Sequence, residues 1–155
     1  MSVKPIPDGY ATATPYLIIK DTAGAIAFYE AAFGAAELFR MPGPDGAIVH
    51  AEIQIGNSRI MLGEECPDWG AIGPKTLGGS PVGICLYVED VDALAERAVA
   101  AGATLSKPVA DQFYGDRSGK LEDPYGHVWT VATHKEDVTP EEMQRRMDAF
   151  MAKAG

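Results

Sequence analysis

The fold is decided by a pattern that occurs twice, Ile18-Ile19-Lys20-Asp21 near the start of the chain and Tyr87-Val88-Glu89-Asp90 past its middle. Each stretch reads as a strand that ends in an aspartate. A helical pattern follows each one and closes on a Gly-Ala pair, at Gly34-Ala35 and Gly102-Ala103. Glycine is the usual residue at the end of a helix. Such a repeat is diagnosed before any single motif, because it determines the architecture.

The sequence around these repeats predicts one α+β domain over residues 1–155. Ala51, Ile53 and Ile55 alternate with polar residues, as in a strand with one buried face. The predicted units are a first βαβββ module over 12–66, a Gly/Pro-rich linker over 67–80, a second βαβββ module over 81–135 and a C-terminal helix over 139–153. Neither module has much core alone. We therefore expect their sheets to pair into one curved, mixed, mostly antiparallel sheet with helices outside.

Composition narrows the classes of protein to consider. The net charge of −9 argues against nucleic-acid binding, which needs clustered Lys and Arg. No apolar run is long enough to cross a membrane, and the first residues lack the apolar centre of a signal peptide, so we expect a cytoplasmic protein. Cys66 and Cys85 belong to no Cys/His cluster, which favours free thiols over a disulfide.

The stretch from Pro108 to His134 is dense in polar and aromatic residues. We interpret its first part as a loop, followed by a tight turn at Asp123-Pro124-Tyr125-Gly126 and a strand over 127–133. Functional groups tend to lie on such loops, and the candidates are Gln112, Tyr114, Asp116 and Arg117. Arg117 is suited to clamp a carboxylate or phosphate of a ligand. Pairing with Asp116 or Asp123 to hold the loop would explain it equally well.

A strand face carries the most informative polar residues, His50, Glu52 and Gln54. They alternate with the apolar residues expected to pack against the first helix, so they should face the inside of the curved sheet. A His and a carboxylate two residues apart are able to act as acid and base or to bind a metal. An exposed strand face of no functional importance would show the same alternation.

Strand parity places three more residues on the inner face, Tyr16, Cys85 and Tyr87. Cys85 has no positioned His or helix N-terminus in the sequence, which argues against a reactive nucleophile. His127 shares a face with Trp129, so we expect a hydrogen-bonded structural histidine there, and we expect His134 at the surface.

The chain resembles the vicinal oxygen chelate superfamily, which includes glyoxalase I, extradiol dioxygenases and bleomycin-binding resistance proteins. The resemblance covers both strand-Asp-helix-Gly-Ala units and the ending Asp123-Pro-Tyr-Gly-His-Val-Trp129. Further strings resemble its PhnB-like branch: Arg40-Met41, Pro44-Asp45-Gly46, His50-Ala-Glu52, Ile60-Met-Leu62, Leu77-Gly-Gly-Ser-Pro81 and Asp111-Gln-Phe-Tyr-Gly-Asp-Arg117. The resemblance implies a cup-shaped site inside each curved sheet, often completed by a second subunit of a homodimer.

Metal-using members of that superfamily hold the ion with four His, Glu or Gln side chains on the inner face. The equivalent positions in this chain fall near Thr14, Met61 or Leu62, Gly83 and Thr130. None is a competent ligand for a divalent cation. We therefore predict that the usual metal site is missing.

Three functions from different classes remain open. The favoured one is a small-molecule binding protein, with a sequestering or resistance-related role, that works as a homodimer without a cofactor. Its predicted ligand-binding residues are Tyr16, His50, Glu52, Gln54, Tyr87, Gln112, Tyr114 and Arg117. The alternative is a glyoxalase- or dioxygenase-type enzyme with Zn, Ni, Mn or Fe at His50 and Glu52. It is disfavoured because a Lewis-acid mechanism needs several preorganised ligands and the sequence shows only this one pair. The third is an interaction protein whose Met-rich C-terminal helix forms the dimer contact.

Overall fold

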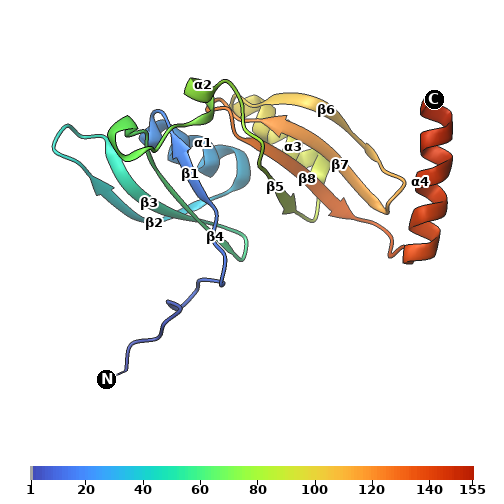
Figure 1. The fold of residues 1–155 in the computed structure, drawn as a ribbon, viewed down its shortest axis with the longest axis horizontal. Helices are drawn as coiled ribbons and strands as arrows, with labels where there is room; N and C mark the ends of the chain where they lie inside the picture. The colour runs from blue at the N-terminus through green and yellow to red at the C-terminus, as the bar shows by residue number, and fades with distance from the viewer. Residues whose placement is uncertain (1) are drawn as a thin grey trace.

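The computed structural model describes residues 2–155 and contains two modules of the same topology (Figure 1). The first comprises β1 (Tyr16–Ile19), α1 (Thr22–Phe33), β2 (Ala36–Pro42), β3 (Ile48–Ile55) and β4 (Ser58–Glu64). The second comprises β5 (Gly83–Tyr87), α3 (Val91–Ala101), β6 (Thr104–Asp111), β7 (Asp116–Glu122) and β8 (Val128–His134). The sheet orders are β1-β4-β3-β2 and β5-β8-β7-β6, with the first strand parallel to the last in each module. The predicted α+β class and the two βαβββ modules are confirmed.

The repeated aspartates and glycines are the ends of the two equivalent helices. Asp21 accepts a hydrogen bond from the backbone N–H of Gly24 at 3.1 Å, and Asp90 accepts one from Ala93 at the same distance. At the other end of α1, Gly34 has a φ of 69° and its N–H reaches the Glu30 carbonyl. A residue with a Cβ is disfavoured in this left-handed conformation. Residues close in the sequence, the capping aspartates and the terminal glycines, therefore determine where both helices begin and end.

The strand β7 corrects the interpretation of the region after Pro108 as a loop. Residues 104–111 and 116–122 form two strands, and only 112–115 turn between them. The polar residues misled the interpretation because Asp116, Ser118 and Lys120 alternate along the open face of the sheet. Pro108 is tolerated because β6 is an edge strand whose pairing with β7 is irregular near Lys107.

The predicted single sheet is corrected to two sheets. No hydrogen bonds join their edge strands β1 and β5 within residues 2–155, and the modules instead pack through α1 and α3 on one side. The linker over 67–80 is not wholly irregular, since it contains a 3-10 turn at Pro67–Trp69 and the short helix α2 at Pro74–Leu77. The helix α4 (Pro140–Ala154) stands at the far end of the second module (Figure 1). No helix of the described residues has the length and apolar character needed to span a bilayer.

A buried carboxylate joins the two modules at their shared core. Asp123, 2% exposed, accepts hydrogen bonds from Tyr29 Oη at 2.6 Å and Trp129 Nε1 at 2.9 Å. Its other oxygen accepts the backbone N–H groups of Tyr125 and His127, which shapes the predicted turn. Burial and the neighbouring Asp123 raise the pKa of Tyr29 well above its ordinary value. The turn is thus the link between α1 and β8.

Candidate functional site

The first open face is the side of the β1–β4 sheet that α1 does not cover. His50, Glu52 and Gln54 lie there half-buried, whereas Ala51 and Ile53 are buried on the helix side. The strand register brings Phe39 of β2 opposite Glu52 and Met61 of β4 opposite both Glu52 and Tyr16. The alternation in the sequence therefore predicted the correct face.

Three of the predicted residues form a chain of hydrogen bonds on this face. Tyr16 Oη lies 2.8 Å from His50 Nδ1, and His50 Nε2 lies 3.1 Å from Glu52 Oε2. Burial raises the pKa of Tyr16. A carboxylate only accepts hydrogen bonds, so His50 Nε2 carries a proton; in the neutral ring, Nδ1 then accepts from Tyr16. Gln54 points elsewhere, since its amide donates to the carbonyl of Gly56 at 3.0 Å.

Gly63 is part of this site, and our reading of the sequence missed it. It lies on β4 beneath the tyrosine ring, where a Cβ would come within 2.9 Å of Tyr16 Oη and 2.5 Å of the Val49 carbonyl oxygen. Pairing of β2 with β3 skips Val49, since Met41 pairs with His50 and Pro42 pairs with Ile48. A side chain at position 63 would therefore clash with the Val49 backbone and press on the tyrosine hydroxyl that bonds to His50. The only signal in the sequence was an isolated glycine in an apolar strand.

The second open face carries a different network. Asp116 Oδ2 accepts from Tyr87 Oη at 2.8 Å, and Asp116 Oδ1 lies 2.7 Å from His134 Nδ1. His134 Nε2 lies 2.8 Å from Asp137 Oδ1, so both ring nitrogens contact carboxylates. These hydrogen bonds raise the pKa of His134, and the bond to Asp116 raises that of Tyr87. Asp116 was a candidate functional residue that the predicted ligand-binding set left out, and His134 was expected only at the surface.

Gln112 and Tyr114, also predicted to bind a ligand, instead form hydrogen bonds to residues of their own hairpin. Tyr114 Oη lies 3.1 Å from Ser118 Oγ, and the Gln112 amide donates to the carbonyls of Ala110 and Ser118. Cys85 lies on the same face and is exposed as a whole, but its thiol is partly desolvated; this desolvation, and then the negative charge of Asp116, raise the pKa of Cys85. A raised pKa disfavours the reactive thiolate.

Arg117 faces the other side of β7. Its guanidinium donates twice to Asp92 of α3, at 2.8 and 2.9 Å, and once to Asp111 at 3.3 Å. The proposed pairing with Asp116 or Asp123 is therefore wrong, because side chains alternate along a strand and Arg117 points away from the open face that Asp116 occupies. The structure does not bring Arg117 together with the other predicted site residues.

The inner face does not fit the metal that the superfamily's metal-using members hold. Thr14 precedes β1, and Leu62 is buried on the helix side. Inner-face positions of β1, β4, β5 and β8 are instead occupied by two pairs of neighbours, Tyr16 with Met61 and Cys85 with Thr130. These side chains supply a phenol, a thioether, a thiol and a hydroxyl in place of the imidazole and carboxylate groups of that pattern. Residues 2–155 contain no group of three or more His, Cys, Asp or Glu side chains arranged to hold a metal ion.

Comparison with known proteins identifies the family. The model of the Glyoxalase/Bleomycin resistance protein/Dioxygenase superfamily matches residues 10–131. The chain belongs to this superfamily. An uncharacterized Mycobacterium bovis protein, Mb0911c, is 42% identical over 139 residues, which cover 88% of this chain and 91% of that protein.

Solved structures support the same assignment. A glyoxalase-related enzyme from Fulvimarina pelagi is 26% identical with a TM-score of 0.65, over 80% of this chain and 88% of that one. A PhnB protein from Bacillus cereus is 16% identical with a TM-score of 0.63, over 79% of this chain and 99% of that one, and shares the fold. The superfamily resemblance seen in the sequence is confirmed, and a PhnB protein is among its structural neighbours.

Proposed function

We propose that this superfamily member binds a small cationic molecule on the first open face, at Tyr16, His50 and Glu52. The observation that carries the proposal is the state of Glu52. Its side chain is 22% exposed, its Oε2 contacts His50, and its Oε1 has no partner among residues 2–155. A half-buried carboxylate with a free oxygen favours a positively charged ligand.

The surroundings of Glu52 match such a ligand. The rings of Tyr16 and Phe39 flank His50, with centroids 5.5 and 6.3 Å from that of the imidazole. Aromatic faces attract cations, most strongly where water is excluded. The net charge of −9 raises the local concentration of cations around the whole molecule.

We further propose that the working form is a homodimer in which a second copy covers this face. Tyr16, Phe39 and Met41 leave 46–48% of their surface exposed next to the site, although all three are large apolar residues. A contiguous patch of this kind is typical of an interface. Light scattering after size exclusion checks the state, and a monomer at working concentrations would contradict it.

The binding test uses benzyltrimethylammonium as the cationic probe and benzyl alcohol as its neutral counterpart, by calorimetry. We expect saturable binding of the cation only, weakened about five- to thirtyfold in Glu52→Gln, because loss of the carboxylate charge removes an interaction of roughly 1–2 kcal/mol. The matched control is Glu122→Gln, a carboxylate of the second module, which should bind normally. Equal binding by wild type and Glu52→Gln would overturn the proposal.

The second candidate is a metal-dependent enzyme, favoured by the convergence of His50 Nε2 and Glu52 Oε2 at 3.1 Å. Such a pair offers two ligands, and further ones would have to come from a second copy or from substrate. Elemental analysis after incubation with Zn, Ni, Mn and Fe(II) separates the two functions. A stoichiometric metal that is lost in both His50→Ala and Glu52→Ala would favour the enzyme, and its absence would leave the binding protein.

A further inference from the structure

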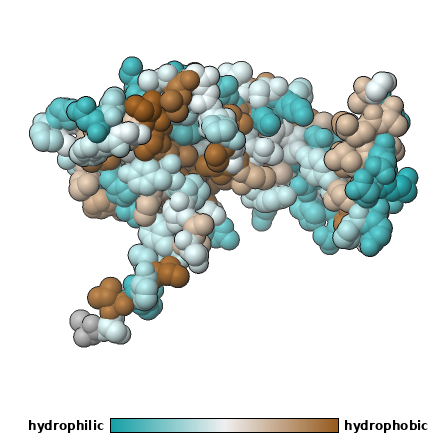
Figure 2. All heavy atoms as spheres, viewed as in Figure 1, coloured by the Kyte–Doolittle hydropathy of each residue, from teal (hydrophilic) through white to brown (hydrophobic). Residues whose placement is uncertain are grey.

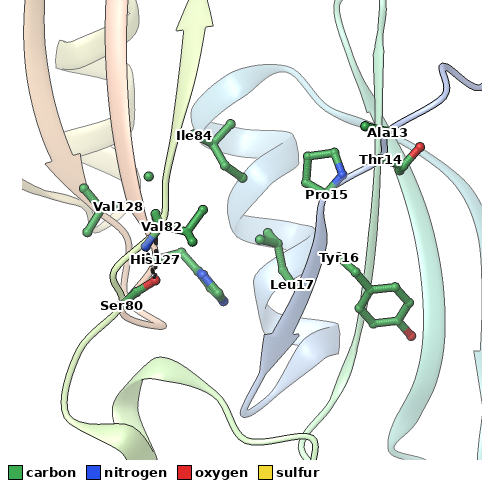
Figure 3. Close-up of a pocket in the computed structure, with 11 residues that line it drawn as sticks. Ala13, Thr14, Pro15, Tyr16, Leu17, Ser80, Val82, Ile84, His127 and Val128 are labelled. Carbon is green, nitrogen blue, oxygen red and sulfur yellow. Dashed lines mark hydrogen bonds between the residues drawn. The ribbon is translucent and has the colours of Figure 1, made fainter.

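A cleft separates the two modules where their edge strands β1 and β5 approach without hydrogen bonding. Its volume is about 560 Å³, within the range of sites for small organic ligands. Its apolar wall is contributed by both modules and consists of Pro15, Leu17, Val82, Ile84 and Val128 (Figure 3). In the space-filling view, hydrophobic residues gather in the middle of this face of the molecule (Figure 2).

Within residues 2–155, no Asp, Glu, Lys or Arg lines the cleft. A charged ligand would therefore lose its hydration without gaining a counter-charge, which is strongly unfavourable. This distinguishes the cleft from the first open face, where Glu52 supplies a carboxylate. Tyr16 is the one residue of that site's hydrogen-bond chain that also lines the cleft.

The imidazole of His127 in the cleft has one nitrogen that is free to accept a hydrogen bond. His127 extends from the start of β8 toward β1, and its Nε2 lies 2.9 Å from the Ile18 carbonyl oxygen (Figure 3). A carbonyl only accepts hydrogen bonds, so Nε2 carries the proton. In the neutral ring, Nδ1 is then an acceptor, and no residue among 2–155 donates to it.

We propose that the cleft is a second binding site, for a neutral, flat apolar molecule with one N–H or O–H donor that bonds to His127 Nδ1. The apolar walls remove the rings of the ligand from water, and the hydrogen bond to His127 Nδ1 fixes its orientation. Sites of this kind, at a boundary between structural units, typically combine extensive apolar contact with a few placed polar groups. The inference goes beyond the cation site and does not depend on it.

The test compares indole with N-methylindole, which differs by loss of the N–H donor. At mildly alkaline pH we expect indole to bind the full-length protein about tenfold more tightly, because the methylated ring leaves Nδ1 without its bond. On ¹⁵N-labelled protein, indole should shift the Nδ1 resonance of His127, and N-methylindole should not. Glu52→Gln should leave indole binding unchanged, which separates this site from the cation site.

Two variants sharpen the outcome. His127→Phe keeps a ring in place but removes the acceptor, so it should bind both probes with equal affinity, whereas Ile84→Phe should narrow the cleft and weaken both. Equal affinities in the wild type, no indole binding, or an unchanged Nδ1 resonance would overturn the proposal. Loss of indole binding as the protein concentration rises and dimers form would overturn it as well, by showing that a second copy occupies the cleft.

Discussion

The two modules have the same topology, but the acidic residues on their open faces differ in how many hydrogen-bond partners they have. On the first face, Glu52 bonds to His50 through one oxygen and leaves the other without a partner in residues 2–155. On the second, Asp116 uses one oxygen for Tyr87 and the other for His134, and its side chain is 10% exposed. His134 is held in turn by Asp137. The first carboxylate is available to a ligand, and the second is engaged by the protein itself.

The two modules therefore repeat the same backbone fold but carry different functional side chains on their open faces. Counting back from the equivalent aspartates Asp21 and Asp90, Tyr16 corresponds to Cys85, and Tyr87 corresponds to Ile18. Tyr16 and Tyr87 therefore do not occupy equivalent positions. Each faces inward, but Tyr87 lies two residues further along its strand than the equivalent of Tyr16, so the two tyrosines contact different neighbours. A fully bonded polar network holds a structure together, whereas a partly bonded one leaves capacity for binding. Substitutions in the core and on the two faces test this contrast.

The largest effect is expected at the buried carboxylate that joins the two modules. Asp123→Ala removes the acceptor for Tyr29, Trp129 and two backbone N–H groups, and leaves those donors buried. We expect a loss of about 3–5 kcal/mol in the free energy of unfolding, measured with urea. The exposed Asp8→Ala serves as the control. A loss below about 1 kcal/mol would show that the modules do not share this link.

The next effect compares the two carboxylates directly through isosteric changes. Asp116→Asn replaces one of two engaged oxygens by a donor, so we expect a loss of about 1–3 kcal/mol in unfolding free energy. Glu52→Gln should change that free energy by about 0.5 kcal/mol or less while weakening binding of the cationic probe. Equal destabilisation by both substitutions would break the contrast between the faces.

A smaller difference is expected between the tyrosines. Tyr87→Phe deletes the hydroxyl that donates to Asp116, and should cost about 0.5–1.5 kcal/mol of unfolding free energy. Tyr16→Phe should cost less, because His50 remains half-exposed and water replaces the lost partner. Reversal of this order in urea unfolding would show that the second network contributes less than its geometry indicates.

The smallest effect is the pH dependence of the bond between Asp116 and His134. The folded state raises the pKa of His134, so its contribution to stability is present below the unfolded value of about 6.5 and disappears as pH rises through the folded value. The melting temperature of wild type should exceed that of His134→Gln most between about pH 5 and 6.5. A gap that widens toward alkaline pH would contradict the assignment, and titration of His134 by NMR checks it independently.

The sequence by itself determined the features that depend on neighbours along the chain. The aspartate caps and terminal glycines specified α1 and α3, and the alternation of His50, Glu52 and Gln54 specified their face of β3. Local patterning failed for β7, because a strand with a polar open face and two glycine-containing turns nearby has the composition of a loop.

Only the tertiary structure decided which groups meet across the chain. Asp123 accepts a hydrogen bond from Tyr29, which lies 94 positions away in the sequence. Arg117 pairs with Asp92, 25 positions away, and not with the adjacent Asp116. The cleft exists because β1 and β5 end their separate sheets instead of joining. Contacts of this kind depend on how helices and sheets pack in space, and the order of residues along one strand carries no record of them.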